Sequence, residues 1–229
     1  MKIFTIALIV FLAAVSGSKQ IDGADASGKA PTTRPIPFEK EILAFEKHDR
    51  AEPPPKDANL FVGSSSIARW KTLADDFPGV PVINRGFGGS RIPDSTRFAD
   101  RIVLPYRPKR IFLYAGDNDI AGGHSPQRIL ADFKTFVQTV RAGLKDVPIY
   151  FISLKPSPLR AKFLPKALET NALIAAYIKD SDNLHYVDVA TPMLGPDGNA
   201  RAALFGPDRL HMNRAGYEIW IGIIAPLLK

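Results

Sequence analysis

Two segments far apart in the chain carry residue types that could together perform acyl transfer. Residues 61–66 form a strand-like run that breaks into a turn of small residues, and Asp208 lies three residues before His211. On one side of a helical turn, a carboxylate at this spacing can hold an imidazole in one tautomer. A serine at a sharp turn between a buried strand and a helix would present the hydroxyl that the imidazole deprotonates. The pattern predicts nucleophilic hydrolysis.

Two further polar islands lie between these segments. Residues 84–89 read Asn-Arg-Gly-Phe-Gly-Gly, and residues 116–119 read Gly-Asp-Asn-Asp. Backbone and amide N–H groups of such loops can stabilise the negative charge that develops on a carbonyl oxygen during attack. Both islands are therefore candidates for an oxyanion site.

The elements that must position these residues alternate between apolar strands and amphipathic helices. The expected strands are residues 60–62, 80–83, 110–115, 147–154 and 185–189. The expected helices are residues 38–50, 67–75, 93–104, 165–179 and 213–228, with the clearest one beginning after an N-cap at Ser125. Strands with little polar alternation indicate a parallel sheet covered on both faces. We expect an α/β fold, a three-layer α/β/α sandwich with a five-stranded parallel sheet.

In such sheets, ligands bind beyond the carboxyl ends of the strands. Residues 63–66, 85–90, 116–119 and 155–158 each follow one of the first four expected strands. These four loops should therefore converge on one rim. The segment 208–211 precedes the last helix and could pack back to the same edge.

The length and composition of the chain indicate how many folded domains it can contain. With 229 residues, 45% of them hydrophobic and 23% charged, the chain fits one sizeable folded domain. Lys2 followed by an apolar run and small residues predicts a signal peptide over residues 1–17, with a retained N-terminal anchor as the alternative. Residues 18–37 are expected to form a flexible leader, and residues 38–229 the domain.

Charge and cysteine content exclude several classes of site and partner. The chain has no cysteine, which rules out disulfides, thiolate metal sites and cysteine nucleophiles. The net charge of +7 would fall to +6 after cleavage of the predicted signal peptide, which contains Lys2. Because the densest basic group, Arg107 to Arg110, is typical of a solvated face, we expect no nucleic-acid partner. We expect export to the periplasm or the medium and no stable membrane insertion after signal cleavage; the oligomeric state stays open.

The order and the residue sequences of these short segments resemble those of the SGNH hydrolase superfamily, also called GDSL esterases, and the resemblance extends over residues 38–229. The blocks of that family would fall on residues 63–65, 84–89, 116–119 and 208–211. The resemblance implies a flavodoxin-like fold and a serine esterase without cofactor or metal. One residue departs from the family pattern, because Ser64 stands where an aspartate usually precedes the nucleophile. Because of this difference, the substrates of the lipase members of the family cannot be assumed for this protein.

The resemblance also implies individual roles. Ser65 would be the nucleophile, with His211 as the general base and acid and Asp208 as its orienting partner. The oxyanion hole would consist of the backbone N–H groups of Ser65 and Gly89 and the side-chain amide of Asn118. Asn84 and Arg85 could brace the glycine loop.

Two assignments have alternatives within the sequence. Alignment with the first block places the nucleophile at the middle of three serines, with Ser66 starting the helix as a capping residue. His185 also has an aspartate three residues before it. Because His185 opens a strand, however, it should lie at the amino end of the sheet, away from the rim. Asp208 could instead cap the last helix.

Asp117 and Asp119 flank Asn118 and could suggest a cation site. No further carboxylate lies at ligand spacing in that loop, so we expect structural hydrogen bonds from loop amides to these carboxylates instead. Other residues near the rim are candidates for the pocket lining: Trp70, Phe87, His124, Lys155, Pro156, Arg160 and residues 193–199. For Trp70, core packing is the favoured interpretation.

The predicted function is an exported serine esterase that removes short acyl groups, most plausibly acetyl, from carbohydrate through an acyl-serine intermediate. Its partner would be a small-molecule or carbohydrate ester. A lysophospholipase or thioesterase for longer chains is the first alternative, and the lack of a long apolar lid segment speaks against it. The second alternative is a catalytically silent carbohydrate-binding module, which would need a pocket but not a nucleophile and base together.

Overall fold

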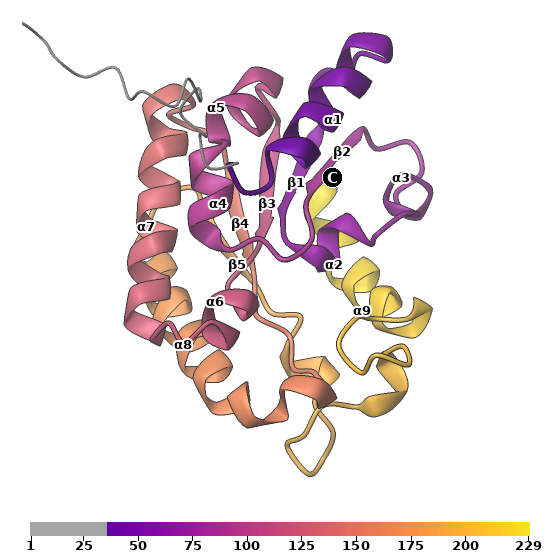
Figure 1. Cartoon of the computed structure of the whole chain (residues 1–229), viewed down its shortest axis with the longest axis vertical. Helices are drawn as coiled ribbons and strands as arrows, with labels where there is room; N and C mark the ends of the chain where they lie inside the picture. The colour runs from indigo at the N-terminus through magenta and orange to yellow at the C-terminus, as the bar shows by residue number, and fades with distance from the viewer. Residues whose placement is uncertain (1–35) are drawn as a thin grey trace, which may run out of the picture. The chain divides into compact units, whose positions relative to one another are not determined.

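The computed structural model describes residues 36–229, so the predicted signal peptide and nearly all of the predicted leader lie outside the described residues. Its centre is a sheet of five parallel strands in the order β2-β1-β3-β4-β5 (Figure 1). The strands are β1 (Asn59–Gly63), β2 (Val82–Gly86), β3 (Arg110–Tyr114), β4 (Ile149–Ile152) and β5 (Leu184–Val187). The predicted three-layer α/β/α sandwich is confirmed, and its strand order is the flavodoxin-like one.

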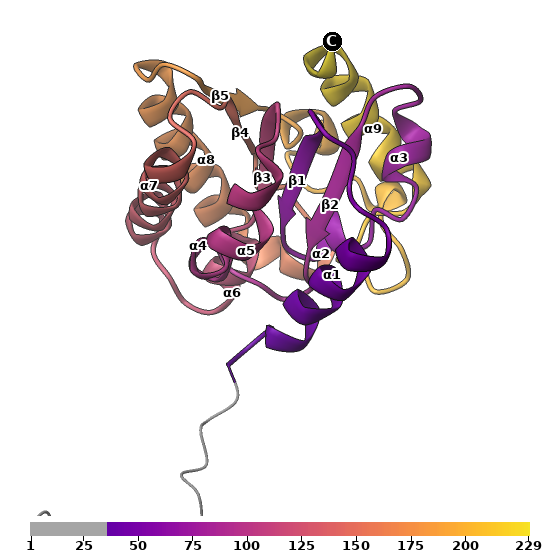
Figure 2. The same ribbon diagram turned by 90° about the horizontal axis from the view of Figure 1, so that it is seen from above.

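Helices cover both faces of the sheet (Figure 2). One face packs against α1 (Glu39–Ala51), α4 (Ile92–Arg97), α5 (Ala99–Ile102), α7 (Pro126–Gly143) and α8 (Leu164–Lys179). The other packs against α2 (Ser65–Ala68), α3 (Leu73–Asp76) and α9 (Arg214–Ile224). Leu60 and Val62 enter the first core and Phe61 enters the second. Burial on both faces explains why the strands lack polar alternation.

Short helical turns complete the chain. They are α6 (Asp117–Ala121) and the 3₁₀ segments Leu104–Tyr106, Pro158–Phe163, Thr191–Met193, Ala202–Leu204 and Ala225–Leu228. The turn α6 was expected as a loop. Ser125 caps α7 as predicted, because its side chain accepts a hydrogen bond of 3.2 Å from the Arg128 N–H. No helix in residues 36–229 combines the length and apolar character that crossing a bilayer requires.

Three expected elements differ from the structure. The helix expected over residues 93–104 is two short helices, α4 and α5, followed by the 3₁₀ segment Leu104–Tyr106. The helix expected over residues 67–75 is two short helices, α2 and α3, because the side-chain amide of Asn84 donates to the carbonyls of Ile67 (2.8 Å) and Trp70 (3.4 Å), where α2 ends. The second strand was expected at residues 80–83 but runs from Val82 to Gly86. Five residues of β2 pair with β1, and this pairing sets the bounds of the strand. It includes Asn84 and Arg85, although polar residues such as asparagine are uncommon in strands.

Candidate active site

The chain turns sharply at the end of β1. Gly63 has a φ of 131°, and a Cβ at this position would lie 2.0 Å from the backbone oxygen of Tyr114 in β3. Only glycine fits such a close approach with positive φ. The Ser64 N–H then donates to the same Tyr114 oxygen at 2.8 Å, and α2 begins at Ser65. The turn therefore places Ser65 at the carboxyl edge of the sheet.

The helix begins two residues earlier than the sequence suggested. Ser64 occupies the N-cap position of α2, whereas Ser66 lies inside the helix and is buried. The expectation that Ser66 caps the helix is wrong, because the tight turn at Gly63 leaves no room for a longer connection. Ser65 is the first helical residue, so its N–H has no partner within the helix.

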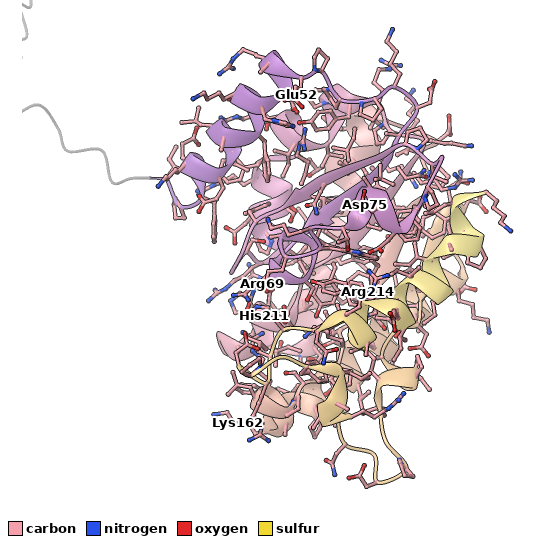
Figure 3. The ribbon with its side chains drawn as sticks, turned by 90° about the vertical axis from the view of Figure 1, so that its right-hand side faces the viewer. Glu52, Arg69, Asp75, Lys162, His211 and Arg214 are labelled. Atoms are coloured by element: carbon pink, nitrogen blue, oxygen red, sulfur yellow. The ribbon has the colours of Figure 1, made fainter. Side chains whose placement is uncertain are left out.

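Ser65, His211 and Asp208 form a continuous hydrogen-bonded chain. The Ser65 Oγ lies 3.0 Å from the His211 Nε2, although the two residues are 146 positions apart. The His211 Nδ1 lies 2.6 Å from the Asp208 Oδ2. With Nδ1–H donating to the carboxylate, Nε2 is the nitrogen that can accept the serine proton. Figure 3 shows His211 beside Arg69 of the serine-bearing segment, and the Arg69 guanidinium lies 3.8 Å from Asp208.

The segment that carries the aspartate and histidine is not the helical turn that was expected. Arg209 has a φ of 56°, and the Asp208 Oδ1 accepts the N–H groups of Leu210 (3.0 Å) and His211 (2.9 Å). This carboxylate-centred turn aims the imidazole at the rim. Hydrogen bonds from the His211 side chain, then from these two backbone amides, lower the pKa of Asp208 well below its usual range. Asp208 does not cap the last helix; the Asn213 side chain does, by accepting the Gly216 N–H at 3.2 Å.

A buried lysine tethers this segment to the sheet. The Lys155 Nζ donates to the Leu210 carbonyl at 2.8 Å and lies 5.3 Å from the centre of the Phe205 ring. A second tether is the hydrogen bond of 2.9 Å from the Leu159 N–H to the Arg209 carbonyl. The sequence placed Lys155 only among candidates for the pocket lining. Its structural role follows from its place directly beyond β4 and from its burial.

Burial lowers the pKa of Lys155 to about 8. Between about pH 8 and the ordinary lysine pKa of about 10.4, the folded protein loses the proton while the unfolded chain keeps it. The free energy of unfolding should therefore rise with pH over this window, by about 2 kcal/mol relative to a Lys155→Met variant between pH 8 and pH 10. Urea unfolding of both proteins at several pH values measures this difference. A difference that stays constant from pH 7 to pH 10 would contradict the prediction.

Asn118 faces the same rim from the start of α6. Its Nδ2 donates to the Ser90 carbonyl at 3.0 Å, and its Oδ1 accepts from the Arg160 Nη2 at 2.8 Å. Arg160 also forms an ion pair of 3.0 Å with Asp117. Because the guanidinium occupies Oδ1, the amide is fixed in one orientation, and the second N–H of Nδ2 stays available for an oxyanion. Sequence reasoning placed Arg160 only near the rim and missed this contact.

The glycine loop follows β2. Gly89 has a φ of 84°, which favours glycine, and it is exposed. At Gly88, an added Cβ would lie 4.0 Å from the Cβ of Ser65, which brings this loop against the serine. In residues 36–229, neither of these two N–H groups donates to a protein acceptor. The loop thus presents free donors next to the hydroxyl.

The two residues expected to brace this loop behave differently. The Asn84 Oδ1 accepts the Gly86 N–H at 2.9 Å while its Nδ2 binds the end of α2, so Asn84 does connect the loop to the serine helix. The Arg85 guanidinium instead binds Asp49 and the Tyr106 hydroxyl. The bracing role expected for Arg85 is therefore wrong, because its side chain points to α1.

Other candidates from the sequence lie away from the serine. His185 is in β5 and stacks on Tyr150, with ring centres 4.4 Å apart. Trp70 and Phe87 are core residues, each about 1% exposed. Asp117 pairs with Arg160 rather than with loop amides, so the expectation is wrong for Asp117. The Asp119 oxygens have no hydrogen bond of full geometry in the described residues, although the N–H groups of Asp119 and Ile92 favour the charged form of this carboxylate.

Cavities do not mark this site. A cavity of about 20 Å³ is lined by Asp117, Lys155 and Arg160 among others, and this volume holds about one water molecule. A larger cavity of about 520 Å³ lies between α1 and β2. Neither cavity is lined by Ser65, Gly89, Asn118, Asp208 or His211.

Replacing Arg160 with Met should lower kcat about 10-fold and leave KM little changed, because the Asn118 amide loses the contact that orients it while the substrate contacts remain. Removing an oxyanion donor outright costs about 10² to 10³ in kcat, which bounds this effect. Steady-state kinetics of the single variants and of the double variant with Asn118→Ala provide the measurement. If Arg160 acts through Asn118, its replacement should have no further effect in the Asn118→Ala background; an undiminished effect there would contradict this role.

The chain is similar to a known protein family and to several solved structures. Residues 58–219 match the GDSL-like Lipase/Acylhydrolase family. Among curated proteins, no sequence matches the chain significantly. A solved structure from Streptococcus pneumoniae superposes with a TM-score of 0.74 at 19% identity, covering 83% of this chain and 92% of its own.

Two further structures share the fold. A GDSL-like lipase from Bacteroides thetaiotaomicron has a TM-score of 0.69 at 20% identity, covering 82% of this chain and 96% of its own. An acetylxylan esterase from Geobacillus stearothermophilus has a TM-score of 0.60 at 13% identity, covering 76% and 94%. The family match covers more than half of the chain. The protein therefore belongs to the GDSL-like lipase/acylhydrolase family and is a hydrolase of ester bonds.

Proposed function

We propose that the protein is a serine esterase in which Ser65 is the nucleophile and His211 the general base. The observation that carries this proposal is the chain of hydrogen bonds from the Ser65 Oγ to the His211 Nε2 (3.0 Å) and from Nδ1 to Asp208 (2.6 Å). No other hydroxyl in residues 36–229 forms such a chain with an imidazole and a carboxylate.

In the proposed reaction, the Ser65 hydroxyl attacks the ester carbonyl as its proton moves to the His211 Nε2. The imidazolium then gives this proton to the leaving alcohol, and an acyl-Ser65 ester remains. Water then attacks this ester as one of its protons passes to the same nitrogen. The bond between the acyl carbon and the Ser65 Oγ breaks, Nε2 returns the proton to this oxygen, and the acid is released. Proton transfer of this kind contributes about 10² to 10⁴ in rate. Asp208 stays ionised throughout because its hydrogen bonds hold its pKa low.

The developing oxyanion would be stabilised by three donors: the N–H groups of Ser65 and Gly89 and the Asn118 amide. Two of them are held before the substrate arrives. Ser65 is fixed by the Gly63 turn, and Asn118 by Arg160 and the Ser90 carbonyl. Donors that need no reorganisation can each contribute about 3 kcal/mol in a site that excludes water.

For the substrate, we propose short acyl esters, and among these acetyl groups on carbohydrate. Structures that share the fold include an acetylxylan esterase and a carbohydrate esterase from Talaromyces cellulolyticus. In keeping with the predicted signal peptide, we propose that the enzyme acts outside the cytoplasm.

The experiment that tests this proposal measures kcat/KM of the purified protein on p-nitrophenyl esters from acetyl to palmitoyl and on acetylated xylo-oligosaccharides. We expect the highest value for acetyl, a steep fall with chain length, and release of acetate from the sugar. A preference for long chains would instead favour the lysophospholipase or thioesterase alternative. Acetyl preference on p-nitrophenyl esters with no acetate released from sugar would reject carbohydrate as the substrate class.

A further inference from the structure

A second cluster of ionisable side chains lies next to Asn118 in the chain and includes residues of α6 and α7. Asp119 comes from α6, His124 from the loop that follows it, and Asp132 from α7. The three residues offer ligand atoms that lie within 4.8 Å of one another. Asp119 is fully buried, and the side chain of Asp132 is 11% exposed. The proposed reaction uses none of them.

The facing atoms of this cluster have no hydrogen-bond partner among residues 36–229. They are both carboxylate oxygens of Asp119, the His124 Nδ1 and the Asp132 Oδ2. The His124 Nδ1 lies 3.9 Å from Asp119 and 4.0 Å from Asp132. These separations are too long for hydrogen bonds, so a protonated imidazole would not satisfy either carboxylate. Four buried polar atoms without partners around one point call for a bound cation or for protons.

Separations near 4 Å are, by contrast, compatible with an ion between the atoms. Zinc binds nitrogen at about 2.0–2.1 Å and carboxylate oxygen at about 2.0–2.2 Å, so ligand atoms in a tetrahedral site lie about 3.3 Å apart, and the atoms of this cluster would have to move closer by about 0.6 to 1.5 Å around the ion. A cation would offset the cost of burying the Asp119 carboxylate, which is fully buried, by neutralising its charge.

The neighbouring arginines leave the facing atoms free. The Arg128 Nε donates to the Asp132 Oδ1 at 2.9 Å, which is the oxygen that points away from the cluster. The Arg91 Nη1 lies 3.5 Å from the His124 Nε2, at the outer side of the ring. Arg128 is mostly exposed and Arg91 partly exposed, so both long side chains can adjust to a bound ion.

We propose that Asp119, His124 and Asp132 form a divalent cation site, and that Zn²⁺ is the ion it takes. One imidazole and two carboxylates are a donor set that zinc accepts, whereas calcium and magnesium prefer oxygen ligands alone. Water would complete the coordination. The ion would join α6 to the start of α7 and so hold the residue next to Asn118. Its role is structural and does not depend on the proposed esterase reaction.

The test uses the full chain after removal of metal with EDTA and dialysis. Isothermal titration with Zn²⁺ should give about one ion per chain, and the melting temperature should rise until this site is filled. Both responses should disappear in His124→Ala and persist in the matched control His48→Ala, which removes an exposed histidine of α1. They should also persist in His211→Ala, which excludes binding at the serine site. Ca²⁺ and Mg²⁺ should have no effect at equal concentration.

Cobalt provides a measurement that needs no variant. Co²⁺ bound to the wild-type protein with nitrogen and oxygen ligands should give visible absorption bands that Zn²⁺ displaces. The proposal is overturned if the wild-type protein gives no such bands and no thermal shift. In that case protons, rather than a cation, satisfy the facing atoms of the cluster. It is also overturned if the zinc response is unchanged in His124→Ala. Asp132→Asn provides a second variant if His124→Ala does not fold.

Discussion

Replacement of Ser65 with Ala is expected to lower kcat for ester hydrolysis by about 10⁴ to 10⁶-fold while the fold and substrate binding persist. The variant retains the oxyanion donors and the imidazole, but it cannot form the acyl-enzyme. A residual rate above that of water should remain because donors and binding act without the nucleophile. Kinetics on p-nitrophenyl acetate measure the loss, and mass spectrometry after labelling with a fluorophosphonate should show a modified Ser65 in wild type alone.

Ser64→Ala is the matched control for this variant. The Ser64 Oγ is buried and has no hydrogen-bond partner in the described part of the chain, so its removal leaves no group unsatisfied. We expect Ser64→Ala to be labelled by the fluorophosphonate as the wild type is. Full activity of Ser65→Ala, or a label on Ser64 or Ser66 in the wild type, would show that the nucleophile is another group.

Replacement of His211 with Ala should lower kcat by a similar factor, because the serine hydroxyl then has no base within reach. The two residues act as one unit, so the double variant Ser65→Ala/His211→Ala should be no slower than either single variant. Asp208→Asn should cost less than His211→Ala, because the Asp208 side chain is 45% exposed and water can partly replace its hydrogen bond to the imidazole.

The chain offers a control with the same local spacing. His185 also follows an aspartate by three residues, but it stacks on Tyr150 in the sheet. His185→Ala should leave kcat within about twofold of wild type, and Asp182→Asn likewise. If kcat falls equally in the His185 and His211 variants, the effect arises from lost stability rather than from catalysis. If the losses in kcat of Ser65→Ala and His211→Ala multiply in the double variant, the two residues do not share one proton transfer.

Local patterns were sufficient to predict the five parallel strands and the capped helix α7. Both depend on short-range physics, namely apolar runs that must be buried on both faces and the Ser125 cap. The roles of the chemical blocks, and the choice of Ser65 among three serines, came from the resemblance to a known family. Local patterns failed where a distant group intervened. The Asn84 amide divides the helix expected over residues 67–75, and pairing with β1 extends β2 over polar residues.

The sequence by itself determined which residues could react, because a nucleophile, a base and a carboxylate are recognisable by type, order and turn chemistry. Only the tertiary structure decided that the Ser65 Oγ meets the His211 Nε2 at 3.0 Å, that Arg160 orients Asn118, and that Asp132 approaches Asp119. These contacts join elements far apart in the chain. Their geometry depends on strand order, helix packing and a residue with positive φ, which no spacing between neighbouring residues encodes.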